Sequence, residues 1–325
     1  MPSGITHMLL SRTVLDNIAE EKGGAILALL SREKGSFLLG SVAPDLPYLS
    51  VADSDLFSNQ AEIADYLHYE HTNAVPLQGF MQVIQQLELK NIKLAETIFA
   101  FYLGYCSHYM ADGLIHPYVR DKVGNYDVAK KEHRILEMKL DVFVAKKFMG
   151  IEVNGVDFQE ELGWIEDCDF KNDIFESYSR LLNSIYGCET ESENVQHWVS
   201  AMQRVFSLAE GQFPKWYRDL LGKPGVIFRD YDDLKDEEAA CLTLQLPIDA
   251  EKFGLTSNFL RKETVHFFDD VTKGFFDRFP LIIINTYEAL FEKREDISTL
   301  LPEINFDTGR LVANNQLSEK PILWG

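Results

Sequence analysis

Three side chains that can bind a metal ion follow one another at intervals of four residues. They are His108, Asp112 and His116, and the residues around them are mostly apolar. Because each step of four residues advances by about 40° round an α-helix, all three side chains share one helix face. A carboxylate is almost never fully buried unless it is paired or bound to a metal. The spacing therefore predicts a metal-binding face on a buried helix over residues 91–116. We expect Pro117 to end that helix, because the residue before a proline disfavours the α region.

A second predicted helix, over residues 128–149, repeats this spacing. His133, Glu137 and Asp141 again lie four residues apart, beside an apolar stripe. Taken alone, Glu137 is explained by a solvated helix face, since lysines lie near it in the sequence. Two helices with the same periodicity of acid and imidazole groups instead favour a shared metal site.

Further candidate ligands precede both helices. His7 lies near the start of the first predicted helix, for which Thr6 is the expected N-cap. Asp45 lies between two prolines, so we expect an extended and stiff backbone there. Taken alone, Asp45 is explained more simply as a turn residue. His68 and His71 are three residues apart and can share a helix face, so either of them is a candidate.

All of these candidates offer nitrogen or oxygen atoms, and none is a cysteine. The candidate metal ligands are His7, Asp45, His68 (with His71 as the alternative), His108, Asp112, His116, His133 and Glu137. A catalytic zinc site takes three protein ligands and keeps one position for water, so this set exceeds the needs of one ion. It predicts two or three Zn²⁺ ions with a bridging carboxylate. Multi-metal sites of this kind typically stabilise displacement at phosphate esters.

The composition argues against several classes of protein. The 325 residues include 51 acidic and 31 basic ones, for a net charge of −20. That charge argues against binding of a nucleic-acid backbone and against docking on an anionic membrane. No apolar run reaches the roughly 18 residues of a transmembrane segment. The N-terminus lacks the features of a signal peptide, and scattered cysteines are typical of a reducing compartment. We therefore expect a cytoplasmic protein, whose oligomeric state stays open.

Helical patterns dominate the chain, so the expected fold class is mainly α. The sequence Gly-Lys-Pro-Gly at 222–225 is the best candidate for a boundary. It divides the chain into a helical domain, residues 1–222, and a C-terminal extension, residues 223–325, of mixed α-helix and short β hairpins. The smaller expected elements are a hairpin turn at 154–155, strand-like stretches at 226–228 and 241–246, helices at 259–278 and 281–294, and a hairpin at 305–312.

Four sequence blocks resemble the zinc-dependent phospholipase C family, whose fold is also used by the P1-type single-strand nucleases. The blocks cover roughly residues 5–145 and read Phe101-Tyr-Leu-Gly…His108-Tyr-Met-Ala-Asp112…His116, His133-x-x-x-Glu137-x-x-x-Asp141, Thr6-His7…Ser11-Arg12 and Gly40-Ser-Val-Ala-Pro-Asp45. The first two blocks, in this order, are specific. The resemblance implies a phospholipase C/P1 nuclease-like bundle of helices and zinc-dependent hydrolysis of phosphodiesters.

The resemblance also implies how the ligands divide among three sites. One ion would be held by Asp45, His68, His108 and Asp112, a second by His116, His133 and Glu137, and a third by His7 with Asp112 as the bridge. His68 is preferred to His71 because an aromatic residue follows it, as in the family block. Asp45 is the expected catalytic residue, which orients or deprotonates the attacking water, and Asp141 is expected to support a ligating histidine. The secreted enzymes also use an N-terminal tryptophan at the third site, and no tryptophan precedes His7 here.

The predicted function is hydrolysis of a phosphodiester, such as a phospholipid or a related head-group ester. A single-strand nuclease is the alternative within the same chemistry, and the net charge of −20 weakens it. A metal-stabilised binding or scaffold protein without catalysis is the alternative from another class.

Overall fold

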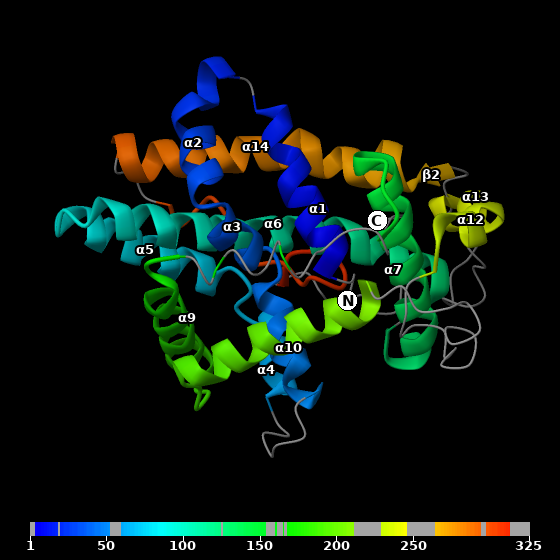
Figure 1. Cartoon of the computed structure of the whole chain (residues 1–325), viewed down its shortest axis with the longest axis horizontal. Helices are drawn as coiled ribbons and strands as arrows, with labels where there is room; N and C mark the ends of the chain where they lie inside the picture. The colour runs from blue at the N-terminus through cyan, green and yellow to red at the C-terminus, as the bar shows by residue number, and fades with distance from the viewer. Residues whose placement is uncertain are drawn as a thin grey trace.

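The computed structural model of the chain describes residues 4–18, 20–52, 60–124, 126–153, 160, 165, 168–210, 229–245, 264–293 and 297–312 (Figure 1). These residues form a mainly α-helical structure, as predicted. The longer helices are α1 (Gly4–Val14), α2 (Glu20–Arg32), α3 (Lys34–Gly40), α4 (Ala61–Tyr69), α5 (Ala74–Glu88), α6 (Ile92–Val123), α7 (Tyr126–Met149), α9 (Lys171–Tyr186), α10 (Ser192–Glu210) and α14 (Lys273–Tyr287). The shorter elements are η1 (Leu15–Asn17), η2 (Ala43–Ala52), α12 (Tyr231–Leu234), η5 (Lys235–Glu237), α13 (Glu238–Leu242), β1 (Thr243–Gln245), β2 (Thr264–His266), η8 (Phe267–Thr272) and η9 (Glu288–Lys293).

Helix α6 is the central element. Most of its 32 residues are buried, and its buried positions do not follow a single stripe. A helix that is buried all round needs neighbours on every side. Helices α3, α5, α7 and α14 all pack against it, and Figure 1 shows α14 running alongside it. The predicted metal-binding face of α6 therefore lies inside the molecule.

Helix α6 continues through Pro117 to Val123, so the prediction that Pro117 ends the helix is wrong. A proline inside a helix removes the hydrogen bond to the carbonyl four residues earlier, which here belongs to Gly113. Gly309 packs against that carbonyl: a Cβ atom added to Gly309 would lie 2.2 Å from the Gly113 oxygen. Gly309 also has a φ of 64°, which favours glycine. Packing by a distant segment therefore covers the carbonyl that the proline leaves without its helical partner.

Helix α3 crosses α6 at a pair of glycines. A Cβ atom on Gly40 would lie 1.9 Å from the carbonyl oxygen of Phe101, and one on Gly104 would lie 2.0 Å from that of Phe37. The two backbones therefore touch, which only residues without a Cβ atom allow. The contact explains the glycine of the Phe-Tyr-Leu-Gly block. It also brings the chain that follows α3 to the side chain of His108.

We expect Gly104→Ala to destabilise the fold, because the added Cβ atom would overlap backbone atoms rather than a side chain that can move. Overpacking typically costs about 1–3 kcal/mol, and we expect a loss at the upper end of that range. Gly24→Ala in α2 is the matched control, since a Cβ atom there meets nothing within 4 Å among the described residues. Helix propensity alone should raise its stability by about 0.5–1 kcal/mol. Urea unfolding measures both variants, and equal stabilities would contradict the close crossing.

The described residues beyond position 222 are mixed in structure, as predicted. Strands β1 and β2 pair antiparallel, with Thr243 opposite His266. The hairpin predicted at 305–312 is present as one antiparallel bridge between Ile304 and Leu311. The predicted domain boundary at 222–225, the hairpin turn at 154–155 and the strand-like stretch at 226–228 lie outside the described residues, so the division into two domains stays a prediction.

Two details of this region differ from the prediction. Residues 264–266 lie within the helix predicted at 259–278 and form a strand instead. Residues 267–293 then form one continuous helical run through Pro280, without the predicted break before position 281. Apolar side chains on both sides of the proline pack against α6 and α2. This burial outweighs the one backbone hydrogen bond that a proline removes.

Candidate metal centre

Four of the predicted ligands meet beside α6. The Nε2 atom of His68 lies 3.3 Å from an oxygen of Asp45 and 3.3 Å from an oxygen of Asp112. The Nε2 atom of His108 lies 3.2 Å from Asp112 and 3.9 Å from Asp45. All four residues are at most 2% exposed. Helices α4, η2 and α6 each contribute to the group, so the site depends on the tertiary fold.

The two histidines of this group have defined tautomers. The Nδ1 atom of His68 lies 2.6 Å from the carbonyl oxygen of Ala64, and that of His108 lies 3.0 Å from the carbonyl oxygen of Ser41. Because a carbonyl only accepts hydrogen bonds, each Nδ1 carries the proton and each Nε2 offers a lone pair. Histidines that bind metals are typically oriented in this way.

The atoms that converge in this group are all hydrogen-bond acceptors. The Nε2 atoms of His68 and His108 lie 3.4 Å apart. The Oδ1 atom of Asp45 and both oxygens of Asp112 accept no hydrogen bond from the described residues. Buried lone pairs that face one another are unfavourable unless a proton or a cation lies among them. The donor set therefore fits a metal ion, and the ligand atoms of His68, His108 and Asp112 all lie within 4.8 Å of one another.

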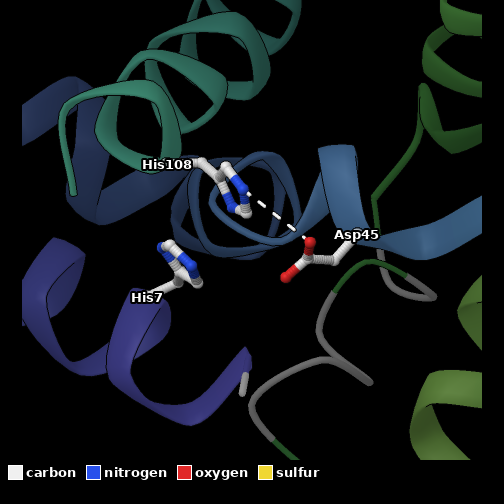
Figure 2. Close-up of side chains that lie close together, drawn as sticks. All are labelled: His7, Asp45 and His108. Carbon is white, nitrogen blue, oxygen red and sulfur yellow. Dashed lines mark ion pairs between the residues drawn. The ribbon is translucent and has the colours of Figure 1, made fainter. Parts of the chain in front are cut away.

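His7 joins this group from α1, and Figure 2 shows it converging with Asp45 and His108. Its ring stacks on that of His108, with centroids 3.9 Å apart, and its Nε2 atom lies 3.1 Å from Asp112. His7, Asp45 and His108 form a second group within 4.8 Å. Burial, with the nearby His108, lowers the pKa of His7 and keeps its ring neutral. Asp112 thus faces His7 with one oxygen and His68 and His108 with the other, as a bridging ligand would.

Asp45 lies in the 3-10 helix η2, so the prediction of an extended backbone is wrong. The φ of a proline, near −65°, suits a 3-10 turn as well as an extended chain. The backbone N–H of Asp45 donates to the carbonyl of Val42 at 3.1 Å, which fixes the start of the turn. Burial opposes the charge of Asp45, but His108 and His68 outweigh it, so the pKa of Asp45 lies below its ordinary value.

The remaining predicted ligands lie one turn farther along α6 and on α7. The Nε2 atom of His116 is 3.5 Å from Asp112 and 4.0 Å from Glu137. His133 donates its Nε2–H to the carbonyl of Gly124 at 2.6 Å, which leaves Nδ1 with the lone pair. Burial lowers the pKa of both histidines, that of His116 strongly, so both are neutral, as metal ligands must be. Among the described residues, His116, His133 and Glu137 do not form a group as compact as those around Asp112.

Asp141 connects α7 to the start of α1. One of its oxygens accepts hydrogen bonds from the backbone N–H of Thr6, at 3.0 Å, and from the Thr6 hydroxyl. Helix α1 begins at Gly4, so Thr6 lies in its first turn and the prediction of Thr6 as the N-cap is wrong. The first turn of a helix has backbone N–H groups without helical partners, and Asp141 satisfies one of them. Asp141 therefore contacts the turn of α1 that carries His7.

The structure separates the two alternatives near α4. His68 is buried in the group, as described above. His71 follows the end of α4 in a backbone conformation with φ of 48°. Its exposed side chain lies 3.7 Å from Glu303, away from the other candidates. Of the two histidines, His68, which an aromatic residue follows, is the one that lies with the other candidates.

We expect the metal-free protein to lose stability as the pH rises from neutral. Burial opposes a charged His68 ring, but a second proton, placed on its Nε2 atom, would be shared with the carboxylates of Asp112 and Asp45, and this outweighs burial and raises the pKa of His68 to about 10. The unfolded value is about 6.5, so the stabilisation is complete below pH ~6.5 and is lost as the pH rises through the folded value. Each pKa unit corresponds to about 1.4 kcal/mol, so the effect amounts to a few kcal/mol. Urea unfolding across this range, with a chelator present, measures it. His68→Gln should show a flatter profile, and equal slopes would contradict the assignment.

The C-terminal segment, residues 297–312, covers the candidate centre, and no sequence motif indicated this. The backbone N–H of Phe306 donates to the carbonyl of His68 at 2.9 Å, and the two rings meet edge to face with centroids 5.3 Å apart. Phe306 is fully buried. Asp307 lies beside His116. The sequence predicts a hairpin at 305–312, but the hairpin pattern does not indicate which surface of the protein the hairpin contacts.

The fold and the site together define a helical protein with a buried histidine–carboxylate centre suited to a metal ion. The sequence model of a family described as zinc-dependent phospholipase C matches residues 6–190, more than half of the chain. The chain therefore belongs to the zinc-dependent phospholipase C family, a family of hydrolases. No curated protein and no solved structure matches it. Of the helices described, none combines the length and the apolar character that a membrane span requires.

Proposed function

We propose that this protein is a zinc-dependent hydrolase of phosphodiesters, with a phospholipid or a related head-group ester as its substrate. One observation carries the proposal: buried acceptor atoms of Asp45, His68, His108 and Asp112 converge where only a proton or a cation satisfies them. Membership of the family indicates zinc as the cation. Imidazole and carboxylate groups are ordinary zinc ligands, which agrees with that choice.

The proposed ligands divide among two or three zinc ions. Asp45, His68, His108 and Asp112 would hold one ion, His116, His133 and Glu137 a second, and His7 with Asp112 a third. Support for the second group comes from the neutral His116 and His133 and from the 4.0 Å between His116 and Glu137. Support for a bridging role of Asp112 comes from the separate directions of its two oxygens.

The residues of the chain have distinct proposed tasks. Zinc bound at the centre would lower the pKa of a water molecule towards neutrality and neutralise charge on a phosphate. Asp45 would orient the attacking water and accept its proton, since its lowered pKa keeps it ionised. The carbonyls of Ala64 and Ser41 would hold the rings of His68 and His108 in place.

The charge of the centre favours an anionic substrate. Three carboxylates, those of Asp45, Asp112 and Glu137, would face two or three divalent ions, which leaves the loaded centre with a net positive charge. The whole chain carries −20, so a long polyanion such as a nucleic acid would be repelled outside the centre. A compact phosphodiester avoids most of that repulsion. We therefore propose a phospholipid or head-group ester as the substrate rather than a single-stranded nucleic acid.

One observation favours a second candidate function, a metal-stabilised scaffold without catalysis. All eight candidate ligands are 6% exposed or less, and residues 297–312 cover part of the group. Structural zinc sites are closed, whereas catalytic sites keep a position open for water. The scaffold candidate predicts bound zinc without hydrolysis.

The cytoplasmic location remains a proposal based on the sequence.

Zinc content and hydrolysis, measured on the same preparation, test both candidates. We expect elemental analysis to find bound zinc. We expect hydrolysis of a short-chain phosphatidylcholine and of bis(p-nitrophenyl) phosphate, which a chelator removes and added zinc restores. His108→Ala should lose both zinc and activity. A purified protein without zinc contradicts the proposal, zinc without hydrolysis supports the scaffold, and release of nucleotides from single-stranded DNA alone supports a nuclease.

A further inference from the structure

Asp307 lies beside the candidate centre although the family match ends at residue 190. One of its oxygens is 4.0 Å from the Nδ1 atom of His116, and the other is 3.5 Å from the Nε atom of Arg120. Arg120 follows His116 by one turn on α6 and is buried, with 1% of its side chain exposed. The carboxylate therefore bridges two successive turns of the helix that carries the ligands.

The nitrogen of His116 that faces Asp307 is opposite the one that faces the other ligands. Its Nε2 atom points towards Asp112 and Glu137, at 3.5 and 4.0 Å. A metal bound at Nε2 leaves the proton on Nδ1, so Asp307 would face an N–H donor. A carboxylate in that place orients the ring and makes the ligand more basic. The three histidines with defined tautomers have backbone carbonyls there, and His116 has this carboxylate instead.

The segment that carries Asp307 is held in place on both sides of the residue. In Figure 1 it is the red ribbon near the middle of the view. Gly309 packs on the carbonyl of Gly113, which Pro117 leaves without its helical partner. Further hydrogen bonds run from the Phe306 N–H to His68, from the Thr72 hydroxyl to the carbonyl of Ile304 at 2.6 Å, and from the Asn73 amide to the carbonyl of Leu301 at 2.7 Å.

We propose that Asp307 is a positioning residue of the metal centre, which orients His116 for zinc through its Nδ1–H. Arg120 orients the carboxylate in turn. The inference rests on the proposed function, because it requires a metal ion at His116. It makes residues 297–312 a part of the centre rather than a separate appendage, and it explains why the segment is anchored on each side of Asp307.

Competition between the protein and a chelator for zinc tests the inference without reference to activity. Asp307→Asn keeps the shape of the side chain and removes its charge. We expect it to hold zinc at one site about 10–100-fold more weakly than the wild type, as is typical of a lost partner behind a ligand. Glu303→Gln is the matched control: it lies on the same segment and removes the charge beside His71, which is outside the centre. Its zinc affinity should equal that of the wild type.

A second variant covers the possibility that Asp307→Asn folds poorly beside the buried Arg120 guanidinium. Arg120→Met combined with Asp307→Asn removes both charges and should weaken zinc by the same factor. The absorption spectrum of cobalt(II) bound in place of zinc should change in both variants and stay unchanged in Glu303→Gln. If the wild type and both Asp307 variants bind zinc with equal affinity, the inference is wrong and the proposed function still stands. The same conclusion follows if Glu303→Gln loses as much zinc affinity as Asp307→Asn. A wild type without zinc overturns the proposed function and the inference with it.

Discussion

Replacing Asp112 by asparagine is expected to remove bound zinc and, with it, all hydrolysis. The oxygens of Asp112 lie within 3.5 Å of the Nε2 atoms of four histidines, which are His7, His68, His108 and His116. Asparagine keeps the shape of the side chain, but it replaces a charged oxygen by an amide that donates hydrogen bonds. An amide group would also point an N–H donor at the imidazole nitrogens, in the place of the ion.

The size of the effect follows from the burial of the site. Removal of one partner from a buried charged pair costs about 3–5 kcal/mol, and each 1.4 kcal/mol is tenfold in affinity, so we expect zinc to bind about 100–4,000-fold more weakly. Elemental analysis after dialysis and calorimetric titration with zinc measure the loss. Asp269→Asn, an exposed change of the same charge, is the control and should bind zinc as the wild type does. If Asp112→Asn bound zinc with the affinity of the wild type, Asp112 would not be a ligand of the centre.

Local periodicity predicted the part of the site that depends on helix geometry. Positions i, i+4 and i+8 share a face in any α-helix, so the common direction of His108, Asp112 and His116 requires no knowledge of the tertiary fold. The same reasoning places His133 near Glu137 on α7. The Phe-Tyr-Leu-Gly block then carries information about packing as well, because Gly104 lets α3 approach α6 closely.

The errors arise where distant packing replaces a local preference. Pro117 is a local signal for a helix end, yet Gly309 covers the carbonyl that it exposes, and α6 continues. Asp45 sits in a 3-10 turn because the φ of a proline fits more than one backbone shape. No sequence pattern predicts Asp307 as part of the centre, for a further reason. Its place beside His116 depends on where a terminal segment docks, and no periodicity links residues so far apart in the chain.

Replacing Asp45 by asparagine is expected to separate zinc binding from hydrolysis. His68, His108 and Asp112 remain to hold the ion and form a compact group by themselves. The variant should therefore fold and keep zinc, with a lower affinity. The group proposed to take a proton from the attacking water would be lost, because an amide is not a base. A positioned general base contributes about 100–10,000-fold to a rate, and we expect a loss of that size in kcat.

The comparison of Asp45→Asn with the wild type also distinguishes an enzyme from a scaffold. Asp45 lies 3.3 Å from His68 and 3.9 Å from His108, whereas Asp112 lies within 3.5 Å of four histidines. An enzyme should therefore show a large fall in kcat for bis(p-nitrophenyl) phosphate with zinc still bound, and Asp269→Asn should leave kcat unchanged. A scaffold should show zinc in both proteins and hydrolysis in neither. If Asp45→Asn retained the wild-type kcat, Asp45 would be at most a ligand. The general base would then be another carboxylate near Asp112. Glu137 is the first candidate, because burial raises its pKa.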